Sequence, residues 1–329
     1  MAHRPSVFVS RQIPEKAIEM LASHFDVDVN REDRALSADE LRVRLQGKAG
    51  LACLLHDRVS ENLLASVPTL RIVSNVAVGY DNIDLTAATR QGVMCTNTPD
   101  VLTDTTADFA FALLTAAARR VVEADGFVRA GKFTEFKIDL LLGQDVHHAT
   151  IGLIGLGRIG RAMARRCRGF DMRVLYHQRH QLDRDEEREL GVTFATKEQV
   201  LSLADFLSLH VPLTPETRHL IGAAELALMK PTAILINTSR GAIVDELALV
   251  DALTTGRIGG AALDVFEQEP QVHPALLGMS NVVLAPHIGS ASHATRERMA
   301  TLAAENCIAA LTGQRPPNLL NPEVLIARA

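Results

Sequence analysis

The stretch 150-TIGLIGLGRIGRAMARRC-167 decides which fold the chain adopts. An apolar run typical of a buried strand leads into Gly155, Gly157 and Gly160, and a helical pattern follows directly. In such a strand-to-helix turn the first glycine permits the tight bend, the second lets the backbone approach a pyrophosphate, and the third lets the helix pack against the strand. A merely structural turn does not need glycines at this density. The stretch therefore predicts a dinucleotide-binding site at the helix N-terminus.

On both sides of this stretch, β-rich runs alternate with helical patterns, which is typical of parallel sheets covered by helices. Strands are expected at 6–10, 25–30, 51–55, 71–76, 92–98, 150–155, 173–177, 205–210, 233–238, 260–265 and 281–286. One long helix with Asp104 as its N-cap is expected over 104–131, and another over 291–313. The predicted fold class is therefore α/β, with two doubly wound parallel-sheet domains.

The composition disfavours several classes of protein. The chain has 329 residues and a formal net charge of −5, so it lacks the basic character of nucleic-acid-binding proteins. No apolar run is long enough to span a membrane, and the N-terminus lacks the apolar core of a signal peptide. Four widely spaced cysteines disfavour a disulfide framework, and the adjacent His147 and His148 have no third ligand nearby, so no metal is expected. We expect a cytoplasmic protein with no nucleic-acid or membrane partner.

The stretch 173-RVLYHQRHQL-182 bears on which nicotinamide cofactor is bound. An acidic residue roughly 20 positions after the glycine fingerprint usually accepts hydrogen bonds from the ribose of NAD. Gln178 occupies that position and removes the repulsion of a 2′-phosphate, Arg179 can bond that phosphate, and His180 can add a donor. NADP(H) is therefore the predicted cofactor. NAD(H) remains the alternative, in which Arg179 only solvates the strand end.

Three polar side chains follow later strands, at the edge where open α/β sheets bind ligands. They are Arg240 in INTSRGAIVD, Glu269 in LDVFEQEP and His287 in LAPHIGSAS. Together they suit the reduction of a 2-keto acid, because an imidazolium can protonate the carbonyl oxygen, a carboxylate favours the charged imidazole, and an arginine can hold the substrate carboxylate or the developing alkoxide. Taken singly, each is better explained as a surface or turn residue. The turn SNVAVGYDNID additionally offers backbone N–H groups to an anion.

In this order the motifs resemble the D-isomer-specific 2-hydroxyacid dehydrogenase family. The resemblance rests on VGYDNID, TPDVLTDTTAD, GLIGLGRIG, HVPLTPETRHLI, MKPTAILINTSRGAIVDE, GAALDVFEQEP and NVVLAPHIGSAS, which together span nearly the whole chain. Within the family, the chain is most similar to the bacterial glyoxylate/hydroxypyruvate reductases, a branch that includes 2-ketogluconate reductases.

The resemblance implies a flavodoxin-like substrate domain of residues 1–103 and 291–329, a Rossmann cofactor domain of residues 104–290, a cleft between them, and a homodimer joined mainly through the cofactor domains. It implies that Arg240 binds the keto acid, that His287 donates the proton and that Glu269 pairs with His287. The backbone N–H groups of Val78 and Gly79 would bind the substrate carboxylate. Further positions that usually line the cofactor are Thr105, Arg158, Ile159, His210, Pro212, Thr217, Thr238 and Asp264.

The expected function is NADPH-dependent reduction of glyoxylate or hydroxypyruvate to the D-2-hydroxy acid. Two alternatives stay open: a 2-ketogluconate reductase of the same family, and a dinucleotide-sensing binding protein that resembles the C-terminal-binding-protein corepressors. Formate dehydrogenases are disfavoured, because they have glutamine where Glu269 stands. The chain contains no tryptophan, so it lacks the one that human-type glyoxylate reductases place near the substrate, and larger substrates remain open.

Overall fold

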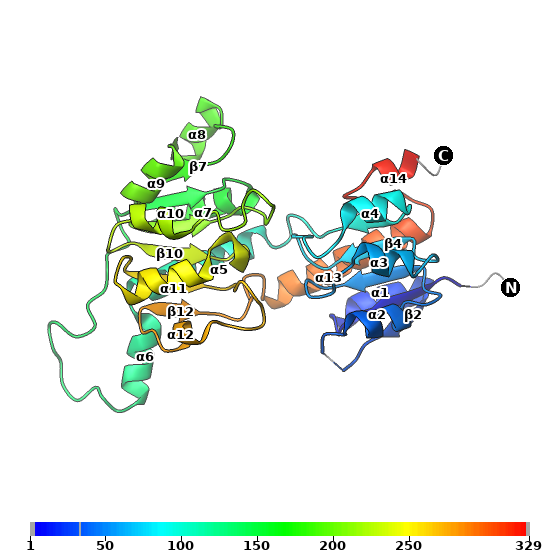
Figure 1. Ribbon diagram of the computed structural model, residues 1–329, viewed down its shortest axis with the longest axis horizontal. Coiled ribbons are helices and arrows are strands. Elements are labelled where there is room, and N and C mark those ends of the chain that lie inside the picture. Colours follow the sequence, from blue (N-terminus) through cyan, green and yellow to red (C-terminus); the bar gives the residue numbers. More distant parts are fainter. Residues whose placement is uncertain (1–3, 33, 327–329) are drawn as a thin grey trace. The chain divides into compact units, whose positions relative to one another are not determined.

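The computed structural model describes residues 4–32 and 34–326. Contacts along the backbone divide the chain into two compact units, one formed by Met1–Leu102 with Ala291–Ala329 and the other by Thr103–Ser290. Each unit contains one sheet whose paired strands are all parallel (Figure 1). Among the described helices, none combines the length and the apolar character needed to cross a membrane.

The first unit is a five-stranded sheet in the order β2-β1-β3-β4-β5, with helices on both faces. Along β3, a side chain at Gly50 would meet α13, whereas Leu51 and Cys53, which point to the opposite face, pack with residues of α2 and α3. Helix α13 also contacts α1 and β4, where the Ser74 hydroxyl donates to the Ala303 carbonyl at 2.7 Å. In chain order the elements are β1 (Ser6–Val9), α1 (Glu15–His24), β2 (Asp26–Val29), α2 (Ala38–Arg44), β3 (Gly50–Cys53), α3 (Glu61–Ala65), β4 (Ile72–Asn75), α4 (Leu85–Arg90), β5 (Met94–Thr96), α13 (His293–Leu311) and α14 (Glu323–Ile326).

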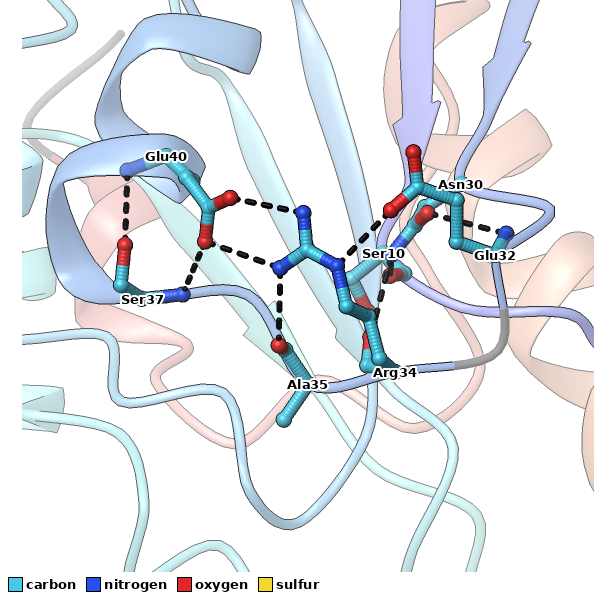
Figure 2. Close-up of polar contacts among 7 residues, drawn as sticks. All are labelled: Ser10, Asn30, Glu32, Arg34, Ala35, Ser37 and Glu40. Atoms are coloured by element: carbon cyan, nitrogen blue, oxygen red, sulfur yellow. Dashed lines mark hydrogen bonds and ion pairs between the residues drawn. The ribbon is translucent and has the colours of Figure 1, made fainter.

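A cluster of hydrogen-bonded polar side chains lies at the end of β2, an edge strand of this sheet. Arg34 donates to Glu32 at 2.7 Å and to the two carboxylate oxygens of Glu40 at 2.7 and 3.0 Å (Figure 2). The buried Asn30 donates from Nδ2 to the carbonyls of Ser10 at 2.9 Å and Arg34 at 3.1 Å. Exposed ion pairs contribute little to stability, so the buried amide of Asn30 is the stronger constraint on how the chain leaves β1 and β2.

The second unit is a seven-stranded sheet in the order β12-β11-β10-β9-β6-β7-β8. This is the strand order of a doubly wound dinucleotide-binding sheet, extended by one strand. Helices α5 and α7 cover one face, and α9, α10 and α11 cover the other. The connections reverse direction between β6 and β9, and a ligand crevice is expected at the carboxyl ends of those strands. The elements are α5 (Thr103–Ala118), α6 (Val121–Arg129), β6 (Thr150–Ile154), α7 (Arg158–Arg168), β7 (Arg173–His177), α8 (Arg184–Leu190), β8 (Val192–Phe194), α9 (Lys197–Leu203), β9 (Phe206–Leu209), α10 (Ala223–Leu228), β10 (Ile234–Asn237), a 3-10 turn (Gly241–Ile243), α11 (Glu246–Thr254), β11 (Gly260–Leu263), α12 (Pro274–Leu277) and β12 (Val282–Leu284).

The single helix expected over 104–131 is two helices, so this prediction is wrong. Helix α5 ends at Ala118 and α6 begins at Val121, because Arg120 between them adopts a left-handed conformation with φ of 53°. Asp104 is not the N-cap either. It lies in the first turn of α5, where its carbonyl and carboxylate accept hydrogen bonds from Arg166. Strand β8 is not among the expected strands, because its sequence VTF has a threonine between two apolar residues and so forms no apolar run.

All four cysteines are free thiols buried in the cores. Cys53, Cys95 and Cys307 lie in the first unit and Cys167 in the second. Burial raises the pKa of Cys95, Cys167 and Cys307 to about 12, and that of Cys53 well above its usual value. These thiols are therefore protonated packing residues at neutral pH.

Candidate active site

The loop between β6 and α7 requires glycine for its shape. Gly155 has φ of 91°, and a Cβ there would lie 2.6 Å from the His210 carbonyl oxygen. A Cβ on Gly160 would collide with the Gly155 carbonyl. A Cβ on Gly157, the residue before α7, would meet no atom within 4 Å. The backbone at Gly157 is thus open to a ligand, beside the helix N-terminus whose first N–H groups have no partner within the helix.

Gln178 ties the end of β7 to this loop. Its Oε1 accepts the Leu156 N–H at 3.1 Å, and its Nε2 donates to the His180 carbonyl at 2.7 Å. A carboxylate at this position could make the first bond but not the second, so the glutamine suits both neighbours. The side chains of Arg179 and His180 are exposed next to it.

Two polar atoms at the carboxyl ends of β9 and β10 are buried and bond no other group in the described part of the chain. One is Nδ1 of His210, whose Nε2 lies 2.9 Å from the Ser208 hydroxyl, and the other is Oγ1 of Thr238. Burial lowers the pKa of His210 to about 4, so its ring is uncharged at neutral pH. Because unsatisfied buried polar atoms are rare in proteins, these two fit a ligand bound at this edge of the sheet.

His287 and Glu269 form a hydrogen-bonded pair in the segments that follow β12 and β11. Nδ1 of His287 lies 2.8 Å from Oε2 of Glu269, whose Oε1 accepts the Phe266 N–H at 3.1 Å. The two side chains are 26% and 19% exposed, respectively. Since Nδ1 is engaged with the carboxylate, Nε2 is the imidazole atom that can exchange a proton with a substrate.

Asp264 fixes the backbone around His287. Its carbonyl accepts the His287 N–H at 2.8 Å, and its carboxylate accepts the N–H groups of Ile288 at 2.7 Å and Gly289 at 2.8 Å. These bonds hold His287 at φ of 55°, a conformation that few residues other than glycine adopt. Burial raises the pKa of Asp264, although the two backbone N–H bonds oppose the shift.

Arg240 follows β10 in a turn that packs against the loop carrying Glu269. Asn237 stabilises this turn, because its Nδ2 donates to the Arg240 carbonyl at 2.9 Å. The next residue, Gly241, leaves no room for a side chain, since a Cβ there would collide with the backbone at Phe266. The structure thus brings the Arg240 turn into contact with the backbone just before Glu269.

Glu267 lies two positions before Glu269 and is not singled out by the sequence. Its carboxylate lies 2.6 Å from Nε2 of His219 and 3.4 Å from the Arg218 guanidinium, and its side chain is 18% exposed. Its N–H donates to the Glu246 carboxylate at 3.1 Å. Glu267 is visible in the sequence only as the first acid of EQEP, and no spacing links it to His219, 48 positions earlier.

The remaining expected site residues divide between the two units. The first unit carries Val78 and Gly79, in the loop after β4. In the second unit, helix α5 meets the segment after β12, because Thr106 lies 3.5 Å from where a Cβ on Gly289 would be. The other expected positions in this unit are Thr105 in α5, Arg158 and Ile159 at the start of α7, and Pro212 and Thr217 in the loop after β9.

The chain matches the family described as D-isomer specific 2-hydroxyacid dehydrogenase, NAD binding domain, over residues 111–289. It is 52% identical over 328 residues to a glyoxylate reductase from Korarchaeum cryptofilum, covering 99% of this chain and 98% of that protein. A glyoxylate reductase from Thermococcus litoralis is 49% identical over 326 residues, with 98% of each chain covered. Among solved structures, the NADPH-dependent glyoxylate/hydroxypyruvate reductase from Sinorhizobium meliloti, in complex with NADP and malonate, has a TM-score of 0.86 at 36% identity over 98% of both chains. The TT0316 protein from Thermus thermophilus has a TM-score of 0.90 at 44% identity, covering 96% of this chain and 99% of that one.

Proposed function

Because the chain belongs to the D-isomer specific 2-hydroxyacid dehydrogenase family, we propose that it reduces glyoxylate to the 2-hydroxy acid with NADPH as hydride donor. Membership of this family and the similarity to glyoxylate reductases confirm the resemblance, the α/β fold class with two parallel sheets, and the prediction of an oxidoreductase. It also confirms a nicotinamide dinucleotide as the cofactor.

Glyoxylate is the proposed substrate because the two relatives quoted above from Korarchaeum cryptofilum and Thermococcus litoralis are glyoxylate reductases. Hydroxypyruvate is the second candidate, because the similar Sinorhizobium enzyme is a glyoxylate/hydroxypyruvate reductase. 2-Ketogluconate shares the same 2-keto carboxylate and serves as the third substrate in the test. In this proposal residues 1–103 with 291–329 bind the substrate and residues 104–290 bind the cofactor, a division supported by the nearly identical bounds of the two compact units.

The observation that carries the proposal is the 2.8 Å contact between Nδ1 of His287 and Oε2 of Glu269. When bound, NADPH supplies a hydride to the substrate carbonyl carbon. His287 donates a proton from Nε2 to the carbonyl oxygen, and Glu269 orients the imidazole and balances its charge. Arg240 holds the keto acid and stabilises the developing alkoxide. Val78 and Gly79 bind the substrate carboxylate through their backbone N–H groups.

The open backbone at Gly157 and the buried polar atoms of His210 and Thr238 fit a dinucleotide at the carboxyl edge of the sheet. The residues proposed to hold it are Thr105, Gly155, Gly157, Arg158, Ile159, Gly160, Gln178, Arg179, His180, His210, Pro212, Thr217, Thr238 and Asp264. The preference for NADPH rests on two features. Gln178 carries no charge that would repel a 2′-phosphate, and Arg179 beside it is exposed and able to bond one.

A homodimer is supported by the apolar surface of the second unit. Helix α6 buries none of its residues, and Figure 1 shows it and the following loop projecting from the sheet. The exposed apolar side chains here are Val121, Val122, Val128, Phe133, Phe136, Ile138 and Leu142. Beside them, Leu277, Met279 and Val283 line a groove along the edge strand β12. Apolar surface of this extent is typical of an interface between subunits, and we propose a second copy of the chain as its occupant. The four free thiols support a cytoplasmic location.

The proposal is tested by measuring kcat/KM for glyoxylate, hydroxypyruvate and 2-ketogluconate, each with NADPH and with NADH. We expect the highest value for glyoxylate with NADPH. The His287→Ala variant should lose about 100-fold or more in kcat while its Kd for NADPH stays unchanged. Near-normal turnover by that variant would contradict the role of His287, and absence of turnover with all three keto acids would contradict the proposed substrate class.

A further inference from the structure

In the loop after β4 of the first unit, three consecutive backbone carbonyls are all held by donors from the ends of the sheet strands. The Ala77 carbonyl accepts the Thr98 N–H at 2.9 Å. The Val78 carbonyl accepts Nδ2 of Asn97 at 2.8 Å, and the Gly79 carbonyl accepts Nδ2 of Asn75 at 2.8 Å. These donors come from the ends of β4 and β5, so all three carbonyls are hydrogen-bonded to groups at the end of the sheet.

The peptide geometry then determines where the N–H groups of the loop point. In a trans peptide the N–H points opposite to the preceding carbonyl, and the only cis bond among the described residues is Glu269–Pro270. The N–H groups of Val78, Gly79 and Tyr80 therefore point away from the donors that hold the carbonyls of residues 77–79. Within residues 4–32 and 34–326, none of these three N–H groups donates to another protein group. They form a run of three backbone donors available to an anion.

Asn75 lies on the sheet side of this loop, opposite to the run of three N–H groups. Its side chain is completely buried, so it acts on a ligand only through the loop. Besides donating to Gly79, it lies 3.3 Å from the Asn82 amide, and Asn82 donates to the carbonyls of Leu54 at 3.2 Å and Asp57 at 3.1 Å. The amides of Asn75 and Asn82 thus connect this loop to the neighbouring loop after β3. The buried Asn75 and the half-buried Asn82 together fix the position of the Gly79 carbonyl, and hence of the Tyr80 N–H, within the folded unit.

We propose that Asn75 is a positioning residue, which fixes the Tyr80 N–H as a third donor to the substrate carboxylate beside those of Val78 and Gly79. The inference rests on the proposed reduction of a 2-keto acid, whose carboxylate these donors would bind. Three donors from one rigid loop would hold a carboxylate in one orientation, so that the keto group is presented in the same way at each turnover.

Asn75→Asp tests the role of Nδ2, because it keeps the size of the side chain but removes the donor to Gly79. Asn30→Asp is the matched control. Asn30 is also a buried strand-end asparagine of the same unit, and its Nδ2 donates to two backbone carbonyls (Figure 2). We expect Asn75→Asp to raise the KM for glyoxylate about tenfold, with the KM for NADPH unchanged, and Asn30→Asp to change neither. Equal effects of the two substitutions on the glyoxylate KM would overturn the inference, because they would indicate a general loss of stability.

A measurement on the unmodified protein covers the case in which Asn75→Asp fails to fold. The chain has two tyrosines, Tyr80 in the loop and Tyr176 in β7, so labelling tyrosine with ¹⁵N gives two backbone amide resonances. Oxalate, which resembles a 2-keto acid, is titrated into the full chain saturated with NADPH. The Tyr80 resonance should shift while the Tyr176 resonance stays. No shift of Tyr80 at saturating oxalate would overturn the inference. This result is separate from the proposed function, because oxalate binding is read even if glyoxylate is not reduced.

Discussion

The backbones of Glu246 and Glu267 are held by each other's carboxylates. The Glu267 N–H donates to the Glu246 carboxylate at 3.1 Å, and the Glu246 N–H lies 3.4 Å from the Glu267 carboxylate. Glu246 begins α11, and Glu267 lies two positions before Glu269, the partner of His287. The start of a helix on one side of the sheet is thereby joined to the loop that holds the acid–base pair.

Removing the Glu267 side chain should therefore affect catalysis through Glu269. We expect Glu267→Ala to lower kcat about tenfold, because the loop loses its bonds to His219 and to the start of α11. The KM for NADPH should not change. Steady-state kinetics check this, with Glu61→Ala as the control, since Glu61 forms an exposed pair with Arg90 in the other unit. An unchanged kcat in Glu267→Ala would show that Glu269 is positioned without it.

Gly241→Ala should damage both stability and activity. The added Cβ would collide with the backbone at Phe266, so the Arg240 turn and the Glu269 loop must separate. We expect a loss of about 1–3 kcal/mol in the free energy of unfolding, together with a lower kcat. Denaturant unfolding and steady-state assays measure the two effects. Gly278→Ala is the control, because its Cβ would come no closer than 3.9 Å to another atom. Equal stability of the two variants would contradict the expected collision.

Arg179→Ala should change the choice of cofactor and leave the chemistry intact. If Arg179 bonds the 2′-phosphate, kcat/KM for NADPH falls about tenfold or more while that for NADH stays constant. Arg188→Ala serves as the control, because Arg188 is exposed and pairs with Asp185 on α8. A parallel fall for both cofactors would place Arg179 outside the 2′-phosphate site.

The buried His210 should make the apoprotein less stable in acid. Its pKa is lowered from 6.5 to about 4 in the folded chain. As the pH falls through this range, the unfolded chain takes up a proton that the folded chain excludes, so stability is lost. Between neutral pH and about pH 4.5 this costs about 2 kcal/mol. His210→Gln should therefore lose less stability than the original chain over the same range. Urea unfolding at both pH values measures the difference, and His24→Gln, at an exposed position, should behave like the original chain.

The strands of both sheets could largely be predicted from the sequence, because most are apolar runs bounded by turns. The break between α5 and α6 could not, since the helical pattern continues through Arg120 and only its backbone conformation ends the helix. The acid–base pair could also be predicted from the sequence, because Glu269 and His287 each follow a strand of one sheet. Their supporting contacts were not, since partners such as Glu267 and His219 come together only through folding.

The buried thiols have a practical consequence. Because each cysteine is protonated and enclosed in a core, a maleimide can react with it only when the surrounding unit opens. The rate of labelling then reports how often the surrounding unit unfolds locally. Cys167 reports on the unit that contains the glycine loop, and Cys53, Cys95 and Cys307 report on the other. Mass spectrometry of the labelled peptides would therefore reveal which half of the chain loosens first, without any introduced probe.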